Sequence, residues 1–280
     1  MAWWWEFNGF EFTEDNRAGV SEATGLDMPD IRSNDVVIPG QHGMFPGFDR
    51  LESRTIGLSV DVHPGEGQPF FTKINELSLA TGPRDDEIPL RFQLGDDQPI
   101  LRSNCRPRRR NTNLSQQSTY GFITTEIQFV ASDPLIYSDD VSSSSASAPT
   151  VPQGKAFSDP YSWDFGAPGV GGVVNVFNAG TAPTSWVAKI FGPCTNPSII
   201  GPGGQLTWES ELQAGEFLEL NSHPSLQTVL VGGSSSQFGQ LSDTSTWFLL
   251  PPGSSNVVLN TGDGNGSVLF TWRSAYWSAT

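Results

Sequence analysis

The feature that most constrains the fold is the stretch from Gly172 to Ile200, in which apolar and polar residues alternate on both sides of a turn. Val174 to Phe177 has a period of two, Asn178 to Pro183 supplies turn-forming residues, and Trp186 to Phe191 alternates again. This spacing is typical of strands that bury one face, because successive side chains of a strand point to opposite sides. The stretch therefore predicts two strands around a turn, at the start of a β domain.

The composition extends this prediction to the whole chain of 280 residues. It holds 30 Gly, 21 Pro, 18 Phe and 9 Trp, with only 16% charged residues, which is typical of many short strands joined by tight turns. The Ser- and Pro-rich segment 139–154 has the composition of a linker. We therefore expect a mainly β protein with an N-terminal domain at 1–138, the linker at 139–154 and a C-terminal domain at 155–280.

The first domain shows strand signals on both sides of one helix. Asn8-Gly9 between apolar residues predicts a hairpin, and Arg54 to Val62 alternates as a strand, whereas residues 13–50 look irregular. Pro69 to Thr81 has helical spacing, with Phe71 widening its apolar stripe. Further strands are predicted at 88–94, 100–105 and 121–131. This order predicts a small split-barrel-like domain whose open side is covered by the helix.

The second domain shows only strand and turn signals, with a spacing that suits a β-sandwich. Its Trp residues are expected mostly in the core, since Trp186 and Trp272 fall on alternating positions. The candidate strands after residue 200 are Gln205–Glu209, Glu216–Leu220, Gln227–Val231, Thr246–Leu250, Asn256–Leu259 and Val268–Trp272.

The charge distribution argues against a nucleic-acid-binding module. The net charge is −15, and residues 1–140 carry 22 acidic against 12 basic residues. An acidic surface repels phosphates, so specific DNA binding is not expected. No apolar run approaches the roughly 20 residues of a membrane helix, and the first residues lack a secretory signal. The chain is therefore expected to be made in the cytoplasm without membrane insertion.

No catalytic, cofactor-binding or metal-binding motif is found, and no enzyme activity or cofactor is predicted. The histidines are scattered and are interpreted as surface or turn residues, and the acidic runs as solvated turns. Two packed, reduced thiols are favoured over a disulfide. The residues weighed are His42, His63 and His223, the acidic runs 85–87 and 96–97, the Gly-rich turn 261–266, and Cys105 and Cys194.

Five arginines stand close together in this acidic chain. Followed by the polar segment Asn111 to Thr119, they predict a long basic loop between two strands. Two interpretations stay open, a solvated loop or a contact with an acidic neighbouring subunit, and DNA contact is less favoured. The candidate interface residues are Arg102, Arg106, Arg108, Arg109 and Arg110.

A series of short motifs extends along nearly the whole chain. The first half contains them at 38–43 (IPGQHG), 54–60 (RTIGLSV), 89–92 (PLRF) and 129–138 (FVASDPLIYS). The second half contains them at 178–183 (NAGTAP), 192–197 (GPCTNP), 215–220 (GEFLEL) and 251–256 (PPGSSN). In this order and spacing they resemble the distal tail proteins of siphophages.

The resemblance implies a structural virion protein at the tip of a long non-contractile tail. It implies an N-terminal domain that forms a six-fold ring and a galectin-like C-terminal β-sandwich. The implied partners are other copies of the chain, the tail tube protein and the tail-tip or baseplate hub proteins, with DNA passing through. We expect the channel wall to be acidic or neutral. The alternative is a carbohydrate-binding or carbohydrate-active β-sandwich protein, including host-glycan recognition by the C-terminal domain.

Overall fold

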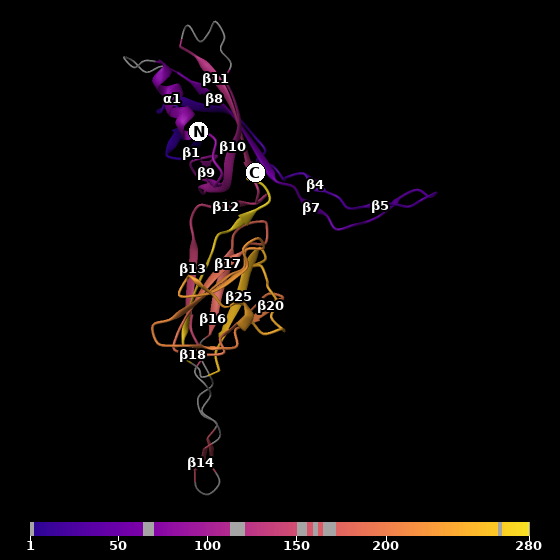
Figure 1. Ribbon diagram of the computed structural model, residues 1–280, viewed down its shortest axis with the longest axis vertical. Helices are drawn as coiled ribbons and strands as arrows, with labels where there is room; N and C mark the ends of the chain where they lie inside the picture. Colours follow the sequence, from indigo (N-terminus) through magenta and orange to yellow (C-terminus); the bar gives the residue numbers. More distant parts are fainter. Residues whose placement is uncertain are drawn as a thin grey trace. The chain divides into compact units, whose positions relative to one another are not determined.

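The computed structural model describes residues 3–63, 70–112, 121–149, 156–158, 162–164, 172–262 and 265–279. Within these ranges the chain is mainly β, as predicted, with one α-helix. It forms two compact units (Figure 1). The first unit is Met1–Asp139 together with Tyr276–Thr280, and the second is Asp140–Ala275. The last residues of the chain therefore belong to the first unit.

The first unit is built on one antiparallel sheet with the strand order β2-β1-β9-β10-β11-β8-β3. The predicted hairpin is confirmed, and its turn has Asn8 and Gly9 at φ 53° and 78°, a backbone conformation that Asn and Gly adopt readily. A short strand, β12 (Ile136–Ser138), pairs with β10 beside this path. The seven strands of the path are β1 (Trp4–Phe7), β2 (Phe10–Phe12), β3 (Ala18–Thr24), β8 (Arg54–Val62), β9 (Ile88–Gln93), β10 (Leu101–Thr112) and β11 (Ile123–Ala131).

The core of the first unit follows the predicted alternation. Ile56, Leu58, Val60 and Val62 on β8 are all buried, as their period of two requires. The predicted helix is confirmed as α1 (Phe70–Ala80), and it buries Leu77 against the sheet. Phe71 is 67% exposed, so the prediction that it widens the apolar stripe is wrong, because α1 rests on a narrower face.

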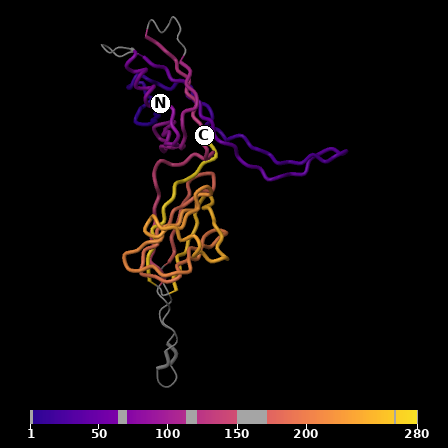
Figure 2. The backbone as a smooth tube through the Cα atoms, viewed as in Figure 1, coloured from indigo at the N-terminus to yellow at the C-terminus, as the bar shows by residue number. Residues whose placement is uncertain are grey.

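A long two-stranded arm leaves the body of the first unit (Figures 1 and 2). It is formed by residues 27–52, which we call the arm. The prediction that residues 13–50 are irregular is wrong here and at β3, because backbone pairing orders segments whose side chains show little periodicity. The arm contains two short ladders, β4 (Ile31–Arg32) with β7 (Arg50–Leu51) and β5 (Val36–Val37) with β6 (Met44–Phe45).

The second unit contains a six-stranded sheet and a four-stranded sheet that share one apolar core, which makes it a β-sandwich. Trp186 is the largest side chain there that is less than 2% exposed, and it stacks on Phe270 at a centroid distance of 4.9 Å. Trp186 and Trp272 are both buried, as predicted.

The larger sheet is β13 (Ser142–Ser147), β26 (Ser267–Trp272), β17 (Trp186–Phe191), β22 (Phe217–Asn221), β23 (Thr228–Val231) and β24 (Ser235–Ser236). The smaller sheet is β16 (Val173–Asn178), β25 (Gly253–Asn260), β19 (Ser198–Gly201) and β20 (Gly204–Thr207). Two short pairs are β18 (Cys194–Thr195) with β21 (Glu211–Leu212) and β14 (Ala156–Ser158) with β15 (Ser162–Asp164). After β26 comes β27 (Ala275–Tyr276), which pairs with β12. Figure 1 labels several strands of the second unit, among them β13, β16, β17, β20 and β25.

Two sequence predictions in this part of the chain are wrong. Ser142–Ser147, predicted as linker, is strand β13 and pairs residue by residue with β26. Its serines are held by the backbone ladder of a neighbouring strand, which composition cannot reveal. Thr246–Leu250, predicted as a strand, makes only isolated bridges at Thr246 and Leu250. Within the predicted linker 139–154, residues 150–154 lie outside the described residues.

Candidate functional site: an open-edged polar sheet

All five candidate arginines lie on β10 (Leu101–Thr112). The prediction of a basic loop is therefore wrong for the residues up to Thr112, which form a strand. Leu101, Ser103 and Cys105 are buried in alternation and start the strand. Beyond them, pairing with β11 from Arg106 to Thr112 continues it although the side chains are polar. The second part of the predicted loop, residues 113–120, lies outside the described residues.

The two halves of β10 have different neighbours. Leu101–Cys105 pairs with β9, whereas Arg106–Thr112 pairs with β11. Among the described strands, none pairs with Arg106–Thr112 on its other side. A groove of about 690 Å³ lies between this edge and the turn after α1, lined by Thr81, Arg84 and Arg108 to Arg110 among others. The second half of β10 is therefore an open sheet edge.

A β-bulge distributes the arginines of this edge. The register shifts between Pro107 and Arg109, so Arg108 has no residue opposite. Arg109 lies opposite Gln128, whereas Arg110 lies opposite Ile127 and donates to Thr81 Oγ1 over 3.1 Å. Pro107 fits an edge strand because it lacks a backbone N–H.

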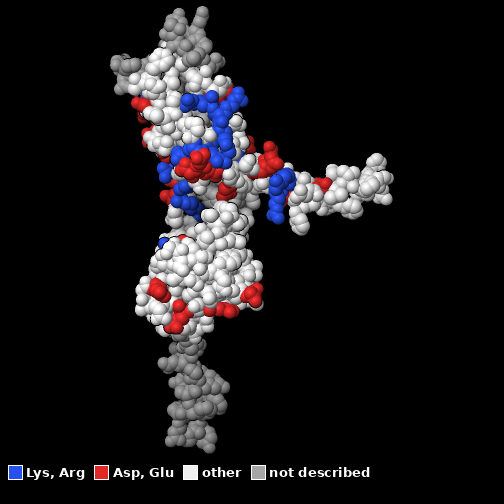
Figure 3. All heavy atoms as spheres, in the orientation of Figure 1, with Lys and Arg blue, Asp and Glu red and all other residues white. Residues whose placement is uncertain are grey.

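The arginines also differ in their electrostatic partners. The Arg102 guanidinium lies 3.6 Å from the Asp139 carboxylate, and Arg106 donates to the carbonyl oxygen of Asp85 over 3.2 Å. Arg108, Arg109 and Arg110 are exposed, and they form no ion pair with any described residue. Figure 3 shows basic side chains gathered on one face of the first unit. Arg102 is thus the arginine of β10 with a carboxylate partner, and the last three are its exposed cations without an ion pair among the described residues.

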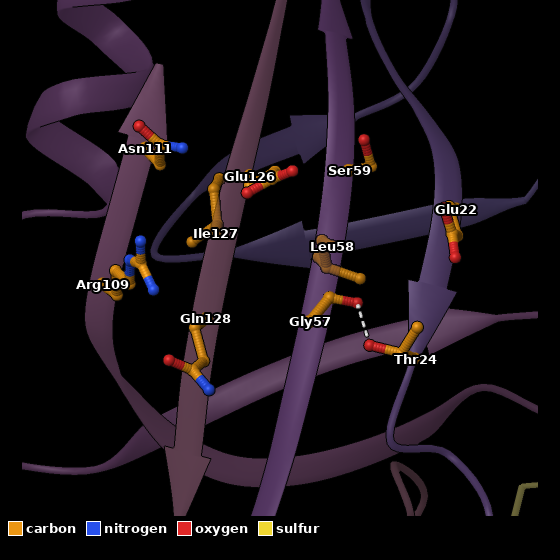
Figure 4. A pocket seen from close by; sticks show the side chains of 10 residues that line it. All are labelled: Glu22, Thr24, Gly57, Leu58, Ser59, Arg109, Asn111, Glu126, Ile127 and Gln128. Atoms are coloured by element: carbon orange, nitrogen blue, oxygen red, sulfur yellow. Dashed lines mark hydrogen bonds between the residues drawn. The ribbon is translucent and has the colours of Figure 1, made fainter. Parts of the chain in front are cut away.

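One face of the four strands β10-β11-β8-β3 is polar (Figure 4). A shallow cavity of about 320 Å³ lies on it. Eight of its ten lining residues form two rows across the sheet, set by the strand register, and Leu58 and Ile127 lie between the rows. The first row is Glu22, Ser59, Glu126 and Asn111, and the second is Thr24, Gly57, Gln128 and Arg109.

The opposite edge of this sheet is β3, which pairs only with β8 among the described strands. It also has a bulge, between Val20 and Glu22. Glu22 is the one charged residue of β3 and is exposed; the residues just before the strand, Glu14, Asp15 and Arg17, are exposed as well. The sheet therefore ends in a cationic open edge on one side and an acidic open edge on the other.

The arm exposes large apolar side chains. Val36, Val37, Met44 and Phe45 are 60–67% exposed, and Phe48 is 84% exposed. An isolated two-stranded ribbon is marginal in water, and exposed apolar clusters mark interaction sites. The arm therefore has the chemistry of a segment that is covered by another protein surface.

A buried guanidinium holds the root of the arm. Arg54 is 2% exposed, and it donates to the carbonyl oxygens of Gly25, Asp27, Pro134 and Trp277 over 2.6–2.7 Å. Burial lowers the pKa of Arg54, and the nearby Asp133 and Asp27 carboxylates oppose that shift. Sequence reasoning missed this role. The signal was available, because Arg54 falls in phase with the buried residues of β8.

The other sequence candidates do not come together into a site. Cys105 and Cys194 are buried thiols that form no disulfide, as predicted. In the described ranges, no group of three or more His, Cys, Asp or Glu side chains could hold a metal ion. Asp86 pairs with Arg84, and Glu87 accepts hydrogen bonds from Ser132, so the acidic run 85–87 is engaged locally. No helix of the described chain is long and apolar enough to cross a membrane.

This fold is shared, over almost the full chain, with hub and baseplate proteins of bacteriophage tails. The Dit protein of phage SPP1, described as a paradigm of the hub adsorption apparatus in phages that infect Gram-positive bacteria, superposes with a TM-score of 0.67. The identity is 16%, over 97% of this chain and 98% of that one. A chain of the activated phage P2 baseplate with Ca superposes with a TM-score of 0.51, at 9% identity, over 97% of this chain and 98% of that one.

Neither a protein-family model nor a curated protein sequence matches this chain. The likeness to the two solved structures shows the fold: this chain has the fold of a phage tail hub protein, as its sequence motifs predict.

Proposed function

We propose that this protein is a structural component of a long, non-contractile phage tail. Copies form a six-fold ring at the distal end of the tail, join the tail tube protein to tail-tip or baseplate proteins, and continue the DNA channel. The observation that carries this proposal is the four-stranded sheet with two open edges of opposite charge, in a chain with the fold of Dit. Nothing in the role requires catalysis.

The sheet has the geometry that a closed ring needs. An open edge is a template for pairing with another chain, and here each copy offers two different edges. Contact between different edges is heterologous, so it closes into a ring when the rotation allows. Because the four strands alternate in direction, β3 runs opposite to β10. A neighbouring copy, related by rotation about the ring axis, then places its β10 antiparallel to the β3 of the first copy. This matches the strand pairs within the sheet, which are all antiparallel.

The polar face of the sheet suits the wall of a channel for DNA. It carries Glu22, Asp61 and Glu126 against Arg109, with Ser, Thr, Gly, Gln and Asn between them. A mildly acidic, mainly polar wall lets a polyanion pass without holding it. We assign this face to the channel, in agreement with the acidic or neutral wall expected from the sequence.

The arm and the arginines supply the contacts between copies. The apolar side chains of the arm gain most by lying on a neighbouring copy, where burial stabilises by about 25 cal/mol per Å² of apolar surface. Arg106, Arg108, Arg109 and Arg110 lie at the open edge that faces the neighbour in this arrangement. Arg102, which contacts Asp139, stays within its own copy.

The test is the size and shape of the purified protein. Native mass spectrometry and particle images are expected to show six-fold rings. Substituting Arg108, Arg109 and Arg110 together by Ser is expected to weaken assembly and to leave the melting temperature of the monomer almost unchanged, since exposed charges contribute little to folding. A wild-type protein that stays monomeric at high concentration and within tails would refute the proposal.

One observation favours a second function, glycan recognition by the second unit. The four strands β16, β25, β19 and β20 contain no charged residue, and Phe177 is 59% exposed beside Asn175. Aromatic rings and amides are the groups that bind neutral sugars. A glycan array with the whole protein, compared with Phe177→Ser, tests it: loss of a signal in the variant supports recognition, and no signal with wild type rejects it.

A further inference from the structure

The two open edges of the polar sheet carry opposite charges on the same face. Arg109 on β10 and Glu22 on β3 both line the polar cavity, at opposite ends of its rows (Figure 4). Within one copy β11 and β8 separate them, so they do not meet. When the edges of two copies join, they become neighbours on one face.

Neither side chain has an internal partner. Both are exposed, and neither forms an ion pair with a described residue. Glu126 also lies on this face, but it faces Asn111 in the register and makes no ion pair with Arg109. Glu22 and Arg109 therefore each lack an ion-pair partner among the described residues, in a chain that has 30 acidic residues.

Both edges are bulged next to the charge. Arg108 and Ser21 are the extra residues in β10 and β3. A bulge interrupts regular pairing and re-aims the neighbouring side chain. Two bulged edges therefore fit each other in few registers, and opposite charges select among them.

We propose that Arg109 of one copy pairs with Glu22 of the next copy across the seam between β10 and β3, and that this ion pair fixes the register of the ring. The inference rests on the ring proposed above and names the residues that specify its seam. The pair also neutralises Arg109, the one guanidinium among the described residues that line the polar cavity. Like charges at an interface oppose association, whereas complementary charges mainly give specificity.

The experiment exchanges the charges one at a time. Glu22→Arg places a cation against Arg109 at every seam, and Arg109→Glu places a carboxylate against Glu22. Each variant alone is expected to need at least about tenfold more protein for half-assembly, because like charges then meet at each seam. Far-UV circular dichroism and the melting temperature of the monomer confirm that each variant folds.

Mixing the two variants gives the decisive result. In a ring where they alternate, every seam again joins opposite charges. Native mass spectrometry, with one variant isotope-labelled, is expected to find rings with three copies of each and almost none of either alone. The matched control is Glu126→Arg, a charge reversal on the same face away from both edges, which is expected to assemble as wild type and to give no preference for alternation with Arg109→Glu.

The outcomes separate the two proposals. If the wild type forms rings and each single variant assembles equally well, the Arg109–Glu22 pairing is overturned and the ring proposal stands. Random mixing of the two variants, or no rescue by mixing, overturns the pairing as well. A wild type that forms no ring overturns the ring and, with it, the seam.

Discussion

Replacing Arg54 by Met tests how the first unit is held together. Met keeps an unbranched apolar stem but removes the guanidinium, so the carbonyl groups of Gly25, Asp27, Pro134 and Trp277 lose their donor. The site is 2% exposed, so water cannot replace the donor without opening the structure. The expected result is therefore a large loss of stability in the first unit.

The magnitude follows from the four hydrogen bonds. Each buried carbonyl left unpaired costs about 1–3 kcal/mol, and local relaxation recovers part of the sum. Breaking a buried charged network costs roughly 3–5 kcal/mol in proteins, so we expect about 4 kcal/mol. At about 2–4 °C per kcal/mol for a unit of this size, the melting temperature falls by roughly 8–16 °C.

Differential scanning calorimetry of the whole chain measures this directly. The melting temperature of the first unit is expected to fall, and that of the second unit is expected to stay unchanged. Hydrogen exchange supplies a second reading, because the amide of Ala279 donates to the Leu26 carbonyl beside this site and is expected to lose protection. Arg54→Lys has three donors for four carbonyls, so the stability of its first unit is expected to lie between those of wild type and Arg54→Met. Arg32→Met, at an exposed position, is expected to change the stability little. A loss below about 1 kcal/mol in Arg54→Met would show that these hydrogen bonds do not hold the unit.

Three further results are expected. Replacing Val36 and Phe45 of the arm by Ser abolishes rings in particle images without lowering the melting temperature of the monomer, because both side chains are exposed; a destabilised monomer would contradict a purely intermolecular role. Burial raises the pKa of Cys105 and Tyr137 above their ordinary values of 9.0 and 10.0, so the unfolded chain releases these protons first and the stability of the first unit falls as pH rises above about 9. Urea unfolding at a series of pH values shows this fall, and it is shallower in Cys105→Ala and Tyr137→Phe. Limited proteolysis spares Ser142–Ser147, because the backbone of that segment is paired with β26, and rapid cleavage there would argue against β13.

The sequence predicts the parts of the fold that depend on side-chain periodicity. Arg54–Val62, α1 and the Asn8-Gly9 hairpin have apolar spacings or turn residues that decide local structure, and they are found as predicted. Elements held by backbone pairing escape this reasoning. Ser142–Ser147 looks like a linker, yet its N–H and C=O groups complete the ladder of β26.

The candidate site shows the same division. The density of arginines in an acidic chain draws attention to Arg102 to Arg110, but it does not show that they lie on a strand. Their counterpart on β3 escapes detection because Glu22 is one of 30 acidic residues, and only the strand order places it at the opposite edge. Arg54 was assigned no role because its partners are main-chain oxygens from distant segments.

The return of the C-terminus to the first unit has a consequence for biosynthesis. Trp277 and Ala279 bond to Arg54 and Leu26, so the first unit is completed only when the last residues of the chain are available. At about 5–20 residues per second, the ribosome needs roughly 7–30 s to make the second unit in between. During that time the root of the arm lacks its final contacts. A chain that stops within the second unit never gains these contacts, so the root of the arm in its first unit stays incomplete.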